Sequence, residues 1–180
     1  MTWLTPYGGR SRVTQRRVGS EAEALVERHH REAADLGLAW ITKRPTPVRV
    51  TSVRGGRVEG FFERSPGVDY AGVLRGGRAV FAEAKSCRAG SFALREIEPE
   101  QWDEMARASA LGALCVLLVA WTPGTRKGEA LLGGRASALC AVPWSVVVSA
   151  RERGDSSLSA RTLAEYSTPA GALWLQTVRE

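Results

Sequence analysis

The sequence is poor in the side chains that bind transition metals, with three cysteines and two histidines among 180 residues. The cysteines, Cys87, Cys115 and Cys140, have no paired metal-ligand spacing and cannot all pair within one chain, so a reducing cytosol is the simpler expectation. Cys115 lies in an apolar run, where we expect it to pack as a small hydrophobic residue. His29 and His30 have no cysteine or acidic metal-ligand spacing around them and are interpreted as ordinary helix residues.

Long apolar runs are also missing. No segment is apolar for long enough to span a bilayer. The residues after Met1 lack the apolar core of a signal peptide. We therefore expect a cytoplasmic protein with no membrane partner. A chain of 180 residues with 44% apolar content is long enough for one compact domain and hardly long enough for two.

Negative charge is in deficit, because 19 Asp and Glu residues face 25 Lys and Arg residues and leave a formal net charge of +6. This balance favours a polyanionic partner, since each phosphate contact made by Lys or Arg releases condensed counterions. Nucleic acid fits, although net charge does not separate DNA from RNA or from anionic lipid. Arginine is dense in residues 1–18, which we interpret as a basic arm that either follows a DNA backbone or is a solvated tail.

Residue patterns predict the order of helices and strands. Helical periodicity and helix-ending residues predict helices at 20–37, at 99–112 and from Pro143 onward. Turn and strand patterns predict hairpin turns at 54–57 and 75–78, an edge strand or extended loop around Pro45 and Pro47, a strand covered on both faces at 113–121 and another strand near 136–142. This order indicates a single α/β domain with a central mixed β-sheet flanked by helices.

Three polar side chains lie in otherwise apolar strand-like sequence: Asp69, Glu83 and Lys85. Hydrolysis of a phosphodiester needs a divalent cation held by carboxylates, and Asp69 and Glu83 could supply them. Lys85 shares a strand face with Glu83, so its ammonium could position the attacking water or stabilise the pentavalent phosphorus. The alternative is that Asp69 caps a turn and the other two are solvated strand charges, but carboxylates in apolar strands need a partner or a cation.

The turn between these two strands decides whether the carboxylates can meet. A two-residue turn at Gly76 and Gly77 would place Glu83 opposite Tyr70 and leave Asp69 on the other face. A three-residue loop of Arg75, Gly76 and Gly77 would set Asp69 directly opposite Glu83, and a β-bulge could do the same. We predict one of these two devices.

Two further polar residues are weaker candidates. Glu23 could complete a metal shell from the first helix, but Ser20 and Glu23 have the spacing of a capping box, which favours a cap. Gln101, near the start of the second helix, would ordinarily be a surface amide.

Several blocks of the sequence, in order, resemble the RecU Holliday junction resolvases of the PD-(D/E)XK nuclease superfamily. The matching blocks are Gly19-x-x-x-Glu23, Lys43-Arg44-Pro45-Thr46-Pro47-Val48, Ser65-x-x-x-Asp69-Tyr70-x-Gly72-Val73, Phe81-x-Glu83-Ala84-Lys85, Ser91-Phe92-x-Leu94, and Gln101 with Met105. The two most specific are the Lys-Arg-Pro-Thr-Pro block and the Asp-Tyr-x-Gly block. The resemblance implies a restriction-endonuclease-like core for residues 19–180 and a bacterial or phage origin.

The resemblance also implies roles for particular residues. It implies that Asp69, Glu83 and Gln101 help to bind Mg²⁺, for which Mn²⁺ would substitute, that Lys85 assists water attack, and that Glu23 belongs to the site. It implies a homodimer with two active sites that makes paired symmetric nicks in a four-way DNA junction. Six basic residues are candidates for DNA phosphate contacts: Lys43, Arg44, Arg49, Arg54, Arg57 and Arg64.

The sequence departs from the family pattern at two places. Val68 stands where the family usually has threonine, so any polar help from that hydroxyl is missing. Residues 50–61, which correspond to the family segment that enters the junction centre, form a short segment here. The alternatives to a junction resolvase are another nuclease of this superfamily, acting on flaps, ends or duplex, and a non-catalytic junction-binding protein.

Overall fold

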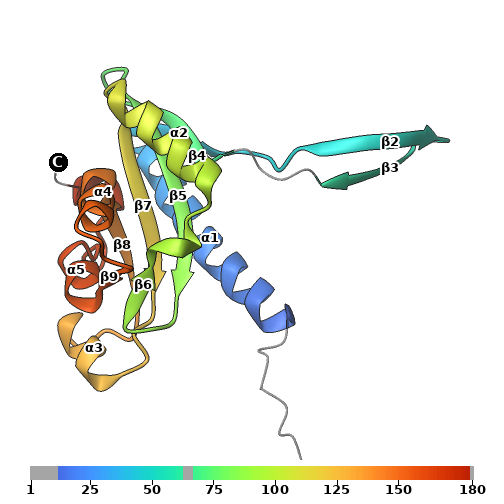
Figure 1. The fold of residues 1–180 in the computed structure, drawn as a ribbon. Coiled ribbons are helices and arrows are strands. Elements are labelled where there is room, and N and C mark those ends of the chain that lie inside the picture. Colours follow the sequence, from blue (N-terminus) through green and yellow to red (C-terminus); the bar gives the residue numbers. More distant parts are fainter. Residues whose placement is uncertain (1–11, 63–66, 179–180) are drawn as a thin grey trace, which may run out of the picture.

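A computed structural model describes residues 12–62 and 67–178, and the side chains of residues 12–20 and 62 are not described. A five-stranded sheet in the order β1-β4-β5-β7-β8 forms the centre of the molecule (Figure 1). Its strands are β1 (Ala39–Lys43), β4 (Tyr70–Leu74), β5 (Ala79–Cys87), β7 (Leu114–Trp121) and β8 (Ala138–Pro143). Only β5 and β7 are parallel, and the other neighbouring pairs are antiparallel. The expected α/β domain with a mixed sheet is confirmed.

Helices cover both faces of this sheet. Helix α1 (Arg12–Asp35) and the short helix η2 (Trp174–Gln176) pack on one face through Val26, Ala33 and Trp174. The other face is covered by α2 (Pro99–Ala110), α4 (Trp144–Glu152) and α5 (Ala160–Glu165). The remaining elements are β6 (Ser91–Ala93), η1 (Leu94–Glu96), α3 (Arg126–Leu131) and β9 (Ser157–Ser159). None of the helices in the described parts of the chain has the length and apolar content needed to cross a membrane.

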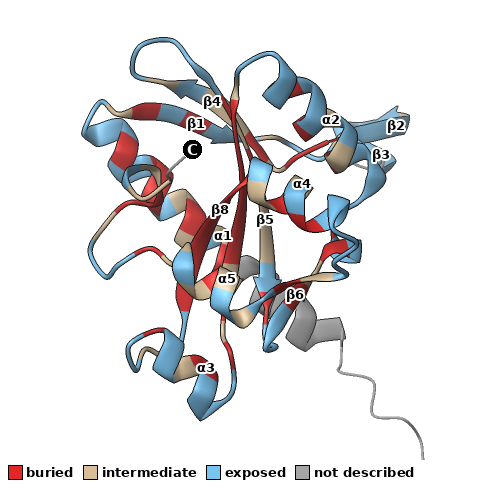
Figure 2. Cartoon of the chain, turned by 60° about the vertical axis from the view of Figure 1, so that its left-hand side comes forward, coloured by how far each residue is buried: buried red, intermediate tan, exposed pale blue. Residues whose placement is uncertain are grey.

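The central strand β7 has the buried character that its apolar sequence predicts. Leu114 to Val119 and Trp121 are all buried, and the alternate residues pack into the two opposite cores. Cys115 is buried, as expected, and all three cysteines are free. In Figure 2 many of the buried residues, drawn in red, lie along the strands in the middle of the sheet. A strand that is buried on both faces must be apolar throughout, which explains its unbroken pattern.

The first helix begins earlier than its sequence pattern indicates. The predicted start at Ser20 is wrong, because α1 begins at Arg12. Part of the predicted basic arm, residues 12–18, is therefore helical, while residues 1–11 lie outside the described residues. Ser20 is inside the helix, where its backbone N–H already has a helical partner, so the proposed cap by Glu23 is also wrong.

Strands β2 (Val48–Arg54) and β3 (Arg57–Phe62) form a two-stranded hairpin that projects from the body of the molecule (Figure 1). The predicted hairpin turn is confirmed. It is a two-residue turn, because Arg54 pairs with Arg57, and Gly55 and Gly56 have positive φ angles of 55° and 77°. Five apolar side chains on this hairpin are between 48% and 65% exposed: Val48, Val50, Val53, Val58 and Phe61. Such a concentration of exposed apolar side chains is typical of a binding surface.

Candidate active site

The turn between β4 and β5 sets the register that the site requires. Tyr70 pairs with Ala82 and Val73 with Ala79, so Arg75, Gly76 and Gly77 form the loop beyond the Leu74–Arg78 hydrogen bond. Gly76 and Gly77 have φ angles of 95° and 90°, which side chains rarely adopt. Of the two predicted devices, a three-residue loop or a β-bulge, the structure contains the loop. In this register the next two residues, Asp69 and Glu83, lie opposite each other.

Reciprocal hydrogen bonds hold the two carboxylates together. The backbone N–H of Asp69 donates to Oε2 of Glu83 over 3.1 Å. The backbone N–H of Ala84 donates to Oδ2 of Asp69 over 3.0 Å. Each carboxylate thus accepts a bond from the strand that carries the other, which fixes both side chains at the same end of the β4–β5 pair.

Glu83 is a buried carboxylate with two side-chain partners. It is 1% exposed, and its Oε1 accepts hydrogen bonds from Gln101 Nε2 at 2.6 Å and Lys85 Nζ at 2.8 Å. Burial, and then the negative charge of Asp69, raises the pKa of Glu83 to about 7, although the Lys85 ammonium opposes this shift. A buried carboxylate beside a half-buried one is costly without enough positive charge, so this arrangement favours a cationic ligand.

Gln101 is oriented by the start of helix α2. Its Oε1 accepts the backbone N–H of Glu98 over 2.9 Å, as part of a capping box, and this directs its Nε2 toward Glu83. Gln101 is 9% exposed, so it is not the surface amide that its position alone would favour. A metal ion would need the carbonyl oxygen of Gln101, which is already engaged at the helix end. In this geometry Gln101 orients Glu83.

Glu23 lies beside the other acidic residues but is bonded to a cation of this chain. Its Oε2 accepts from Lys43 Nζ at 2.5 Å. The bond to Glu23 raises the pKa of Lys43, and the charge of Asp69 adds to this effect. Among the described residues, no group of three or more His, Cys, Asp or Glu side chains stands at metal-binding distance. The structure therefore brings Asp69, Glu83, Lys85 and Gln101 together. Glu23 instead forms an ion pair with Lys43.

The predicted DNA-contacting residues separate into three groups. Arg49, Arg54 and Arg57 lie on the projecting hairpin and are exposed. Arg44 is half-buried in an ion pair with Glu104, and Lys43 is paired with Glu23. Arg64 lies outside the described residues.

Glu104 has a structural role that its sequence position did not reveal. Its Oε2 accepts the backbone N–H of Val68 over 2.8 Å, and its Oε1 accepts from Arg44. A Cβ at Gly67 would overlap the Glu104 carboxylate, so a larger residue there would displace this side chain. Glu104 lies one helical turn after Gln101 and so presents its side chain to the same end of the sheet. It fixes the two residues that precede Asp69.

Replacement Glu104→Ala is expected to displace Asp69, because Val68 N–H and Arg44 both lose their acceptor. We expect a loss of stability of about 1 to 3 kcal/mol and an affinity of the carboxylate pair for a divalent cation that is lower by about 10- to 100-fold. Thermal unfolding and a calorimetric titration with Mn²⁺ measure the two effects. Glu104→Gln keeps an oxygen for Val68 and should recover most of the cation affinity. An alanine variant with unchanged metal dependence would contradict this role.

The residues present fit a divalent cation. Asp69 and Glu83 offer adjacent carboxylate oxygens, the ligands that Mg²⁺ and Mn²⁺ prefer. Burial, and after it the negative charge of Asp69, raises the pKa of Glu83, and a bound cation would oppose both effects. The side chain of Lys85, which contacts Glu83, is 22% exposed, so this side of the carboxylate pair faces solvent.

Comparisons with known proteins agree on one family. The profile of the family "RecU: Recombination protein U" matches residues 17–126 of this chain. Among curated proteins named Holliday junction resolvase RecU, that of Shouchella clausii is 34% identical over 45% of this chain and 42% of its own length. The protein of Bacillus pumilus is 29% identical over 64% of this chain and 62% of its own length, and that of Ligilactobacillus salivarius is 27% identical over 66% and 54%. The matches thus span less than two thirds of each of these relatives. Because the profile covers more than half of the chain, this protein belongs to the RecU family.

Proposed function

We propose that this protein is a metal-dependent DNA endonuclease that resolves four-way junctions. The observation that carries the proposal is the meeting of Asp69 and Glu83 across the β4–β5 pair, with Lys85 bonded to Glu83. The curated relatives, named Holliday junction resolvases, support the choice of substrate.

Asp69 and Glu83 would hold Mg²⁺, for which Mn²⁺ would substitute, through their carboxylate oxygens. The bound ion would supply an activated water and would neutralise charge on the scissile phosphate. Glu83 must be ionised for this task, and Lys85 favours its ionised form. Gln101 keeps the Glu83 carboxylate in one orientation through the 2.6 Å bond.

Lys85 is the residue that we assign to the reacting phosphate. Its ammonium, 2.8 Å from Glu83 Oε1, is held at the edge of the carboxylate pair. From this position it would orient the attacking water and stabilise negative charge on the phosphoryl oxygens. Lys43, held by Glu23 and close enough to feel the charge of Asp69, would contact an adjacent phosphate. We thus assign Glu23 to the site as the residue that positions Lys43.

The projecting hairpin and its arginines, Arg49, Arg54 and Arg57, would contact the branched part of the substrate. A homodimer would present two equivalent sites to strands of like polarity, which is the symmetry that paired nicks require. Such a protein would act on chromosomal or phage DNA in a bacterial cytoplasm. Residues 19–180 would form the nuclease domain, with the residues before them as a basic extension.

The test is cleavage of a labelled synthetic four-way junction with Mg²⁺ by the purified protein and by Asp69→Asn, beside linear duplex and flap substrates. The asparagine side chain keeps an oxygen that can accept from Ala84 N–H, so the fold is expected to persist. We expect symmetric nicks confined to the junction with the unchanged protein and none with the variant. Cleavage of flaps or duplex in preference to the junction would indicate another nuclease. Tight junction binding without cleavage in Mg²⁺ and Mn²⁺ would indicate a non-catalytic protein.

A further inference from the structure

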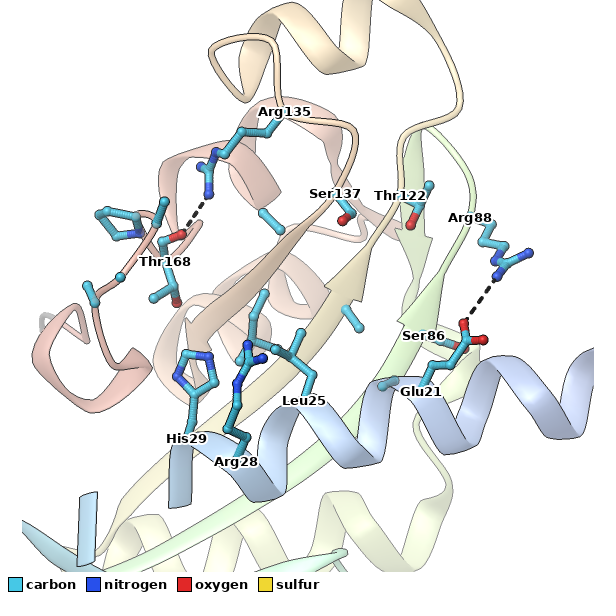
Figure 3. Close-up of a pocket in the computed structure, with 18 residues that line it drawn as sticks. Glu21, Leu25, Arg28, His29, Ser86, Arg88, Thr122, Arg135, Ser137 and Thr168 are labelled. Carbon is cyan, nitrogen blue, oxygen red and sulfur yellow. Dashed lines mark hydrogen bonds and ion pairs between the residues drawn. The ribbon is translucent and has the colours of Figure 1, made fainter. Parts of the chain in front are cut away.

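A cavity with several polar side chains in its lining lies away from the carboxylate pair, on the side of the sheet that α1 covers. It has a volume of about 390 Å³ and lies between α1, the adjacent ends of β5, β7 and β8, and residues 168–172 (Figure 3). Figure 3 shows Ser86 and Arg88 at one side, with Thr122 and Ser137 opposite α1. Ser86 follows Glu83 by three residues on the same strand and therefore points to the opposite face of the sheet.

Three arginines from different parts of the chain surround this cavity. Arg28 comes from α1, Arg88 follows β5, and Arg135 precedes β8, and Figure 3 shows them on different sides of the pocket. Arg135 is fixed in place, because its guanidinium donates to the carbonyl oxygens of Leu132 at 3.1 Å and Thr168 at 2.9 Å. Arg28 and Arg88 each lie 4.0 Å from a glutamate, Glu32 and Glu21, in exposed ion pairs. An anion bound between the three guanidinium groups would further lower their mutual repulsion.

The other polar groups of the lining favour the same kind of ligand. Glu21 is the one carboxylate in the lining, and it lies 4.0 Å from Arg88 in a largely exposed ion pair. The lining therefore keeps a positive excess. The hydroxyl of Thr168 is buried in a residue that is 4% exposed, and it has no hydrogen-bond partner within the described parts of the chain. Hydroxyls and guanidinium groups together are the usual donors to phosphate oxygens.

We propose that this cavity is a subsite for a backbone phosphate of the DNA that this protein binds, on the sheet face opposite Glu83. The proposal rests on the proposed function. Because the cavity and Glu83 lie on opposite faces of the sheet, the subsite would hold a phosphate of the bound DNA away from the cut. Arg88 would exchange Glu21 for that phosphate.

The test measures how DNA binding depends on salt, in a chelating buffer so that no cleavage occurs. Arg28→Gln with Arg88→Gln removes two arginines whose side chains are 60% and 48% exposed, so folding is not at risk. Each lost phosphate contact should lower the slope of log K against log salt by about 0.9. Because both arginines face one phosphate, we expect a decrease of about one unit in the slope. The matched control is Arg153→Gln with Arg161→Gln, exposed arginines outside the cavity, which should leave the slope unchanged.

A second variant shifts the affinity in the opposite direction, which misfolding does not do. Glu21→Gln removes the only carboxylate of the lining and should tighten DNA binding several-fold at the same salt concentration. An unchanged slope in the double variant together with unchanged affinity in Glu21→Gln would overturn the proposal. If the double variant instead loses binding of inorganic pyrophosphate while its DNA slope is unchanged, the cavity takes a free phosphate compound and the DNA assignment fails. Because these measurements need no cleavage, they are separate from the test of nuclease activity.

Discussion

Replacement Glu83→Gln is expected to abolish metal-dependent cleavage and, at the same time, to stabilise the metal-free fold. Cleavage should fall by at least about 10²- to 10³-fold, because the variant loses a charged ligand and the partner of Lys85. The gain in stability follows from burial. Glu83 is 1% exposed and its pKa is raised to about 7 in the folded protein, above its ordinary value of 4.5. Ionised Glu83 therefore destabilises the fold.

The same shift predicts how stability depends on pH. Between pH 4.5 and 7 the folded protein holds a proton on Glu83 that the unfolded chain releases, so the free energy of unfolding falls as pH rises through this window. The contribution of Glu83 is complete below pH 4.5 and is lost above pH 7. The loss is about 3 kcal/mol, and the glutamine variant, which does not titrate, should avoid it.

Denaturant unfolding from pH 5 to pH 8 in a chelating buffer measures this effect. The unchanged protein should lose stability across the range relative to Glu83→Gln, and Mg²⁺ should restore stability only to the unchanged protein. Glu165→Gln, at an exposed carboxylate on α5, is the matched control and should follow the unchanged protein. Parallel pH curves for Glu83→Gln and the unchanged protein would show that Glu83 is not a strained buried acid.

Removal of the tip of the β2–β3 hairpin is expected to leave the body folded and to remove the preference for branched DNA. The two strands pair only with each other, so the central sheet does not depend on them. Arg49 lies opposite Phe61, and residues 50–60 can therefore be replaced by Asn-Gly, which closes a two-residue hairpin turn at this point. The deletion removes Arg54 and Arg57 and three of the exposed valines, Val50, Val53 and Val58.

Competition binding of a four-way junction against linear duplex measures the preference. We expect the ratio of the two affinities to fall by about 10- to 100-fold, with a melting temperature close to that of the complete protein. The full-length variant Arg54→Gln with Arg57→Gln separates the effect of charge from that of hairpin shape. It should lower the slope of log K against log salt by up to about two units. It should keep more of the preference for the junction over duplex than the truncated protein does. A truncated protein that still discriminates junction from duplex would refute this role.

Prediction succeeded where the information is local in the chain. The facing of Asp69 and Glu83 depends on one loop length, because side chains alternate along a strand and a one-residue shift moves Asp69 to the other face. The sequence left open whether a three-residue loop or a β-bulge brings the carboxylates together, and the observed register is that of the loop. The start of α1 was predicted wrongly because Ser20 resembles a cap although helical backbone continues on both sides of it.

Contacts between segments that are distant in the chain could not be predicted from the sequence. The sequence shows that Glu104 and Gln101 share a helix face, but not that this face lies over Gly67 and Val68. Arg44 remains a predicted DNA contact, but no local signal in the sequence indicates its ion pair with Glu104. The carbonyl of Gln101 was expected to be available for metal, whereas the end of α2 engages it.

The sequence by itself determined the α/β order of elements, the buried strand β7, both glycine turns and the pairing of the two carboxylates, since each depends on short-range periodicity or on loop length. The tertiary structure alone decided the environment of those carboxylates: the burial that raises the pKa of Glu83, the partners Gln101 and Glu104, and the arginine-lined cavity beside α1. Burial and hydrogen bonding between segments depend on how the helices pack against the sheet. That packing is stabilised by many weak contacts between distant residues, so it cannot be predicted from any short stretch of sequence.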